Sequence, residues 1–131
     1  MSHIKVDYEP RYHGHVQNGR AQLVLGPEEN EFGPYDLVLG GLSGCFYVTF
    51  LGITEKMQLT FTGVSMSIDG HHREEPPTLL QHIIIDMEVQ GADREKEKQF
   101  QRAVEIAGKY CSVYQTLSAV AEIEVNLTLT A

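Results

Sequence analysis

One stretch of the sequence restricts the possible fold more than any other. From Gly33 to Ile53 the chain reads as a helix with apolar residues on every side, apart from small residues and an aspartate near its start. A helix that is apolar all round has to be buried in protein or in a membrane. Each of its four interior glycines costs about 1 kcal/mol relative to alanine; they are Gly40, Gly41, Gly44 and Gly52. We expect these glycines to let another backbone approach closely.

The length of this apolar stretch argues against a membrane span. Leu37–Ile53 is shorter than the roughly 18–20 apolar residues that a spanning helix needs, and glycine and serine interrupt it. The first residues of the chain have neither the basic nor the apolar segment of a secretory signal. We therefore expect a buried helix in a cytoplasmic protein without a membrane partner.

Length and charge limit the remaining classes. The 131 residues correspond to one domain over residues 1–131. The net charge of −8 argues against a nucleic-acid partner, which needs a basic surface. The same charge disfavours adsorption to anionic lipid.

The hydrophobic pattern predicts an α+β fold in the order β-β-β-α-β-β-α-α-β. Asn18-Gly19 is the strongest hairpin signal. Strands that come in hairpins predict a mainly antiparallel sheet. One small sheet cannot cover so apolar a helix, so we expect a homodimer that buries it. The expected strands are residues 3–9, 12–17, 20–25, 61–70, 80–90 and 121–130, and the expected helices are 34–56, 92–110 and 111–118.

The chain has two cysteines, Cys45 in the apolar helix and Cys111 at the predicted start of a later helix. A structural disulfide is not expected in a reducing compartment, so a pairing would be catalytic or redox-sensing. Two inert buried thiols are the alternative.

Local electrostatics favour Cys111 as the more acidic thiol, because a helix start lowers a thiol pKa. Cys45 lies in the middle of its own helix and would need a cation from elsewhere in the chain. The candidate cations are Arg20, Arg11 and Arg73.

Other common chemistries lack their sequence patterns. The six histidines include His13, His15, His71 and His72, but none has the spacing of a zinc site. The glycines of Gly40–Gly44 fall inside a helix, where their N–H groups are already used, so they do not form a phosphate loop. We expect no metal and no cofactor.

Two segments resemble signatures of the OsmC/Ohr family, the osmotically inducible and organic-hydroperoxide-resistance proteins. Gly33–Cys45 resembles the first signature, and Lys109–Ser118 with the strand after it resembles the second. The resemblance implies an OsmC-like fold in an intertwined homodimer with buried central helices. It also implies thiol-dependent reduction of organic hydroperoxides in oxidative-stress defence.

In the scheme that the resemblance implies, the Cys45 thiolate attacks the peroxide and becomes a sulfenic acid. Cys111 then condenses with it to a disulfide, and an external dithiol restores both thiols. A non-catalytic OsmC-like dimer that binds a small apolar ligand is the alternative. A structural fold with inert thiols is a further one.

The family activates its first cysteine with an arginine that a glutamate holds. Arg20 occupies roughly the arginine region, while the glutamate position falls on Tyr35, next to Asp36. Asp36 could substitute, although nine residues at about 100° each place it opposite Cys45 on a straight helix. Ser112 and Tyr114 stand where proline and histidine are common. These departures indicate a general OsmC-like member rather than either well-described branch.

Overall fold

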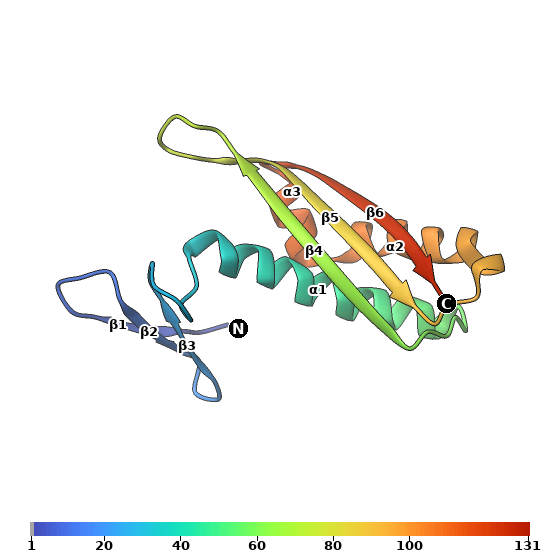
Figure 1. The fold of residues 1–131 in the computed structure, drawn as a ribbon, viewed down its shortest axis with the longest axis horizontal. Coiled ribbons are helices and arrows are strands. Elements are labelled where there is room, and N and C mark those ends of the chain that lie inside the picture. The colour runs from blue at the N-terminus through green and yellow to red at the C-terminus, as the bar shows by residue number, and fades with distance from the viewer. Residues whose placement is uncertain (1) are drawn as a thin grey trace. The chain divides into compact units, whose positions relative to one another are not determined.

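A computed structural model describes residues 2–131, and its contacts divide the chain into two compact units. The first unit ends at Val38 and the second covers Leu39–Ala131. The first holds β1 (Lys5–Tyr8), β2 (Gly14–Gln17) and β3 (Gln22–Leu25), and the second holds the remaining strands with most of the helical residues. The order of strands and α-helices is the predicted one (Figure 1).

The first unit is an antiparallel sheet with the order β1-β2-β3. The predicted hairpin joins β2 to β3. Asn18 Oδ1 accepts hydrogen bonds from the backbone N–H groups of Arg20 and Ala21, at 2.9 and 2.8 Å. Gly19 has a φ of 92°, which glycine adopts without steric cost.

Helix α1 extends over Pro34–Lys56. Proline suits the first position of a helix because the N–H that it lacks would have no partner there. The side chain of Asp36 turns back and accepts a hydrogen bond from the N–H of Gly33 at 2.8 Å. The negative charge in the first turn also complements the helix dipole. The predicted helix is thus confirmed within a few residues at its end.

The sheet of the second unit contains β4 (Gly63–His72), β5 (Leu80–Gln90) and β6 (Glu122–Thr130), in that spatial order. β4 and β5 are antiparallel, whereas β5 and β6 are parallel. A parallel pair needs a long crossover, and the helices between β5 and β6 supply it. These helices are α2 (Glu97–Tyr110), preceded by a short 3₁₀ turn at Arg94–Lys96, and α3 (Ser112–Ser118).

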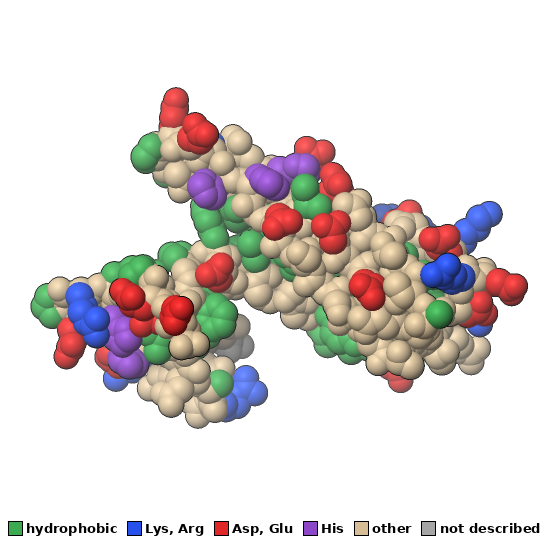
Figure 2. Space-filling model, in the orientation of Figure 1, with side chains coloured by type: hydrophobic (Ala, Val, Ile, Leu, Met, Phe, Trp, Pro, Cys, Tyr) green, Lys and Arg blue, Asp and Glu red, His purple; other side chains and the backbone are tan. Residues whose placement is uncertain are grey.

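Alternate residues of β5 form the sheet's contribution to the core. Ile83, Ile85 and Val89 are fully buried, while their neighbours point to the other face, as the strand period requires. That outer face is polar and carries several carboxylates, and Figure 2 shows acidic side chains over the second unit in red. The full sequence is acidic as well.

Among residues 2–131, α1 is buried along one stripe only. Leu42, Phe46 and Phe50 are fully buried and Thr54 nearly so, at intervals of four residues. Val48 is 63% exposed and Leu51 38% exposed. A β-carbon placed on any of the four interior glycines would meet no atom within 4 Å. The expected close approach of another backbone therefore does not occur within the described chain.

Length and composition alone would allow α1 to cross a membrane. The helix has 23 residues, and an 18-residue window has a mean hydropathy of 1.7. The core helix of a soluble protein passes the same criteria, and the buried stripe of α1 packs on protein.

Candidate functional site

Cys111 sits at the junction between α2 and α3. Its φ and ψ of −76° and 116° are extended, so α2 ends at the residue before it and α3 begins at the residue after it. As the N-cap of α3, its Sγ accepts a hydrogen bond from the backbone N–H of Tyr114 at 3.4 Å. Cys111 is completely buried.

Cys45 lies beside this junction, so folding brings the two thiols together across 66 positions. Neither forms a disulfide in this structure, and Cys45 is only partly buried. Its Sγ lies within hydrogen-bonding reach of the Val113 backbone N–H, the Cys111 thiol and the Ser112 backbone N–H. The first turn of a helix has N–H groups without intrahelical partners. α3 directs two of these groups at Cys45 and a third at Cys111.

This arrangement gives the two thiols opposite pKa shifts. Hydrogen bonds from the Val113 N–H, then from the Cys111 thiol and the Ser112 N–H, lower the pKa of Cys45, and burial opposes them only in part. Burial is the main cause that raises the pKa of Cys111, and the neighbouring Cys45 thiol raises it further. A donor that faces a thiolate stabilises its charged form, whereas desolvation destabilises it.

The prediction that Cys111 is the more acidic thiol is therefore wrong. It considered the dipole of each cysteine's own helix, and Cys45 does gain little from α1. The donors that lower its pKa belong to α3, which is far away in sequence. The signal that could have identified them was the predicted helix start just after Cys111.

An apolar groove of about 530 Å³ lies between α1 and α2. Val48, Thr49 and Gly52 form part of its wall, one to two turns beyond Cys45 on the same face of α1. Tyr110, the neighbour of Cys111, lines it as well. The remaining lining residues are Ile53, Lys56, Met57 and Ile106.

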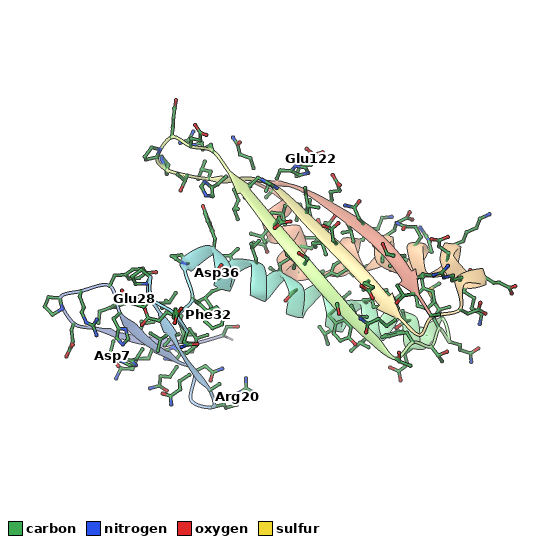
Figure 3. The ribbon with its side chains drawn as sticks, viewed as in Figure 1. Asp7, Arg20, Glu28, Phe32, Asp36 and Glu122 are labelled. Carbon is green, nitrogen blue, oxygen red and sulfur yellow. The ribbon has the colours of Figure 1, made fainter. Side chains whose placement is uncertain are left out.

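The other two predicted site residues, Arg20 and Asp36, both belong to the first unit. Arg20 lies in the turn between β2 and β3, and Asp36 lies in the first turn of α1 (Figure 3). Within residues 2–131 no ion pair joins their side chains. Arg20 lines a shallow polar hollow together with Asp7 and His15.

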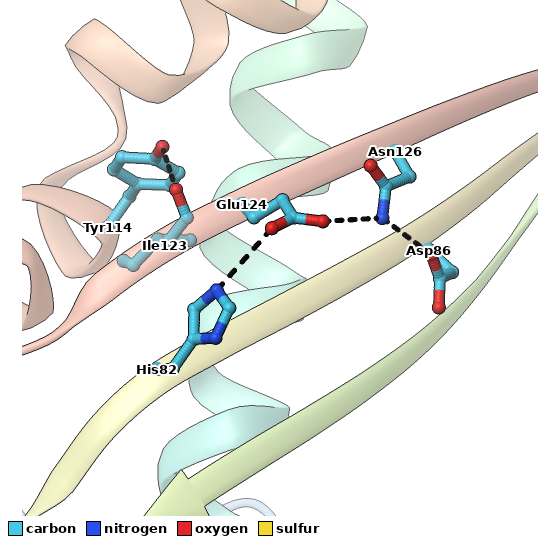
Figure 4. A network of polar contacts seen from close by, with 6 residues as sticks. All are labelled: His82, Asp86, Tyr114, Ile123, Glu124 and Asn126. Carbon is cyan, nitrogen blue, oxygen red and sulfur yellow. Dashed lines mark hydrogen bonds and ion pairs between the residues drawn. The ribbon is translucent and has the colours of Figure 1, made fainter.

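Several histidines have a partner close by. His13 Nδ1 lies 2.8 Å from the Glu31 carboxylate, and the His13 and His15 rings meet edge to face. On the outer face of the second sheet, His82 Nε2 lies 3.4 Å from Glu124, whose carboxylate also contacts Asn126 (Figure 4). Among residues 2–131, no three His, Cys, Asp or Glu side chains are grouped so that they could hold a metal ion.

The chain is an α+β protein with two three-stranded sheets and a pair of thiols at a helix junction. Comparison with known proteins identifies its family. The model of the family described as "OsmC-like protein" matches residues 26–126. The chain belongs to the OsmC-like family, as its sequence signatures predicted. A search of the curated proteins gave no match.

Solved structures share the fold along the whole chain. An OsmC-like protein from Mycoplasma pneumoniae has a TM-score of 0.88 at 20% identity, covering 100% of this chain and 98% of that one. An organic hydroperoxide resistance protein from Legionella pneumophila has a TM-score of 0.76 at 14% identity, with coverages of 98% and 96%. The organic hydroperoxide resistance protein OhrB of Bacillus subtilis gives 0.69 at 13% identity, with 98% of each chain covered. At these identities the likeness concerns the fold.

Proposed function

We propose that this protein is a thiol-dependent reductase of organic hydroperoxides. The Cys45 thiolate attacks the outer peroxide oxygen, so that an S–O bond forms, the O–O bond breaks and the alcohol leaves after taking a proton. The Cys111 thiol then attacks the Cys45 sulfenic acid, forming a disulfide and releasing water. An external dithiol reduces the disulfide and is itself oxidised. All steps stay on the reversible part of cysteine oxidation.

The observation that carries this proposal is the asymmetry of the two thiols. A peroxide-attacking cysteine has to be a thiolate near neutral pH, and donors from α3 lower the pKa of Cys45. A resolving cysteine can remain a buried thiol until it is needed, and burial raises the pKa of Cys111. Two solved structures with the same fold are organic hydroperoxide resistance proteins, which supports the substrate class.

The proposal includes a cytoplasmic homodimer and a role for Arg20 and Asp36. The exposed apolar face of α1, with open space at its glycines, supports a second copy as its cover. Arg20 is proposed as the cation beside the Cys45 thiolate and Asp36 as the acid that holds it. Their support is the family resemblance, and the substitutions Arg20→Met and Asp36→Asn test it in the assay below.

The test is consumption of cumene hydroperoxide with dithiothreitol as the dithiol. We expect turnover in the unmodified protein and none with Cys45→Ser, because a hydroxyl is not a nucleophile at neutral pH. Cys111→Ser should lose the disulfide and accumulate the Cys45 sulfenic acid, which dimedone traps for mass spectrometry. Equal turnover by the unmodified protein and Cys45→Ser would refute the proposal.

The groove supports a second candidate function, a non-catalytic dimer that holds a small apolar ligand. Its volume lies in the range of small-molecule sites and its lining is mostly apolar. Native mass spectrometry distinguishes the two functions. A retained small molecule together with no peroxide turnover favours the ligand-binding function.

A further inference from the structure

We propose that Tyr114 is a positioning residue for the cysteine pair: its ring holds the first turn of α3 against α1 and α2, with the backbone donors of that turn directed at Cys45. The inference deepens the proposed function and rests on the same site. The family resemblance does not supply this role, because Tyr114 stands where histidine is common.

The contacts of Tyr114 connect the elements that surround the two thiols. Its ring stacks on Phe46 of α1, with the centroids 6.0 Å apart and an interplanar angle of 26°. Phe46 is fully buried and adjacent to Cys45. On the α2 side, a β-carbon placed on Gly108 would lie 3.3 Å from the Tyr114 ring, so the ring packs closely over this glycine.

The backbone of Tyr114 is tied to the site directly. Its N–H donates to Cys111 Sγ at 3.4 Å, two residues after the Ser112 N–H and one after the Val113 N–H that face Cys45. A stacked side chain and a capped backbone therefore fix the same helical turn. If the ring were lost, nothing in this set of contacts would hold the turn against Phe46. The N–H groups would then be free to move away from Cys45.

The ring matters more than the hydroxyl. The Tyr114 hydroxyl donates to the carbonyl of Ile123 in β6 at 3.5 Å, which is long for such a bond (Figure 4). An offset aromatic pair stabilises packing beyond the burial of its rings. Phenylalanine keeps the ring and loses only the long bond, whereas leucine keeps apolar volume and loses the stacking geometry.

The experiment measures the pH dependence of Cys45 alkylation by iodoacetamide in fully reduced protein, with the modified cysteine identified by peptide mass spectrometry. Donors to the thiolate lower its pKa, so a misplaced turn raises the pH midpoint. We expect Tyr114→Leu to raise the midpoint by about one unit, which slows alkylation about tenfold at pH values well below both midpoints. Tyr114→Phe should restore the midpoint of the unmodified protein. Val120→Ala, at an exposed residue beyond the other end of α3, is the control.

Circular dichroism and thermal melting establish which variants are folded before alkylation. A folded Tyr114→Leu with an unchanged midpoint would overturn the proposal. So would Tyr114→Phe with as large a shift as Tyr114→Leu, because the hydroxyl rather than the ring would then be responsible. If Tyr114→Leu does not fold, Tyr114→Met replaces it with the same expected shift. Alkylation needs no peroxide, so its result is independent of turnover. If the Tyr114 variants shift the midpoint as expected but the unmodified protein does not turn over peroxide, only the proposed reductase function is refuted.

Discussion

At the scale of single residues, the site consists of two sulfur atoms with different surroundings. The Cys45 sulfur receives hydrogen bonds that favour its anion, while the Cys111 sulfur is withdrawn from water. The pKa of Tyr114 is shifted as well: burial raises it, and the charge of the nearby Cys111 thiolate raises it further. In the proposed function, the division between an attacking and a resolving thiol rests on these donors and on burial.

The hydrogen bond between the two thiols predicts a graded effect at Cys111. Cys111→Ala removes a donor to the Cys45 thiolate and the acceptor that caps α3, so the pKa of Cys45 should rise toward its ordinary value. Cys111→Ser keeps a hydroxyl donor and a good helix N-cap, so its effect should be smaller. Alkylation of Cys45 at a series of pH values measures both. A lower pH midpoint in Cys111→Ala than in the unmodified protein would contradict the assignment of the Cys111 thiol as a donor.

At the scale of elements, one face of α1 packs into the core and an adjacent face carries Cys45. The stripe from Leu42 to Thr54 packs into the core. There the ring centroids of Phe50 and Phe61 are 5.7 Å apart. The Phe61 ring also packs against that of Phe100 in α2, with the ring centroids 6.4 Å apart. This aromatic chain holds α1 to α2, and Cys45 is presented on the adjacent face of the same helix.

Truncating the α1 end of this aromatic chain should cost the second unit much of its stability. Phe50→Ala deletes a fully buried ring, and we expect a loss of about 3–5 kcal/mol in the free energy of unfolding. Glu55→Ala, at an exposed position of the same helix, should change it by less than about 0.5 kcal/mol. Urea unfolding followed by circular dichroism measures both. Similar values for the two variants would show that the stripe is not the anchor of α1.

At the scale of the whole molecule, the chain leaves unusual apolar surface on its longest helix. Val48 and Leu51 are exposed, and the four glycines of α1 face open space. A helix keeps costly glycines where something has to approach its backbone. Nothing in residues 39–131 does so, which is why a second copy of the chain is part of the proposed function.

A charge placed on this face should separate the copies. Val48→Glu puts a carboxylate where the proposed partner would bury it without a counter-charge, which costs several kcal/mol, while the chain itself keeps that position exposed. We expect monomers with unchanged secondary structure, measured by size-exclusion chromatography with light scattering. Lys98→Glu on the exposed side of α2 is the control and should remain dimeric. A dimeric Val48→Glu would exclude this face as the interface.

The sequence by itself determined the local structure. Hydrophobic periods predicted the order of the elements, Asn18-Gly19 predicted the hairpin, and Pro34 with Asp36 indicated the start of α1. These features depend on residues a few positions apart, so the sequence pattern contains them. The same pattern selected Cys45 and Cys111 as the candidate thiols, because they are the chain's two cysteines and each occurs in a segment that resembles a family signature.

Only the tertiary structure decided how these parts act on one another. The parallel pairing of β5 with β6 follows from the crossover through α2 and α3, and the helix pattern alone did not indicate its direction. The acidity of Cys45 depends on N–H groups at Ser112 and Val113, which lie more than 60 positions away and come from a different helix. A hydrogen bond requires its atoms to be within about 3.5 Å. The packing of α3 against α1 sets that distance, and the hydrophobic periodicity of a single helix carries no information about it.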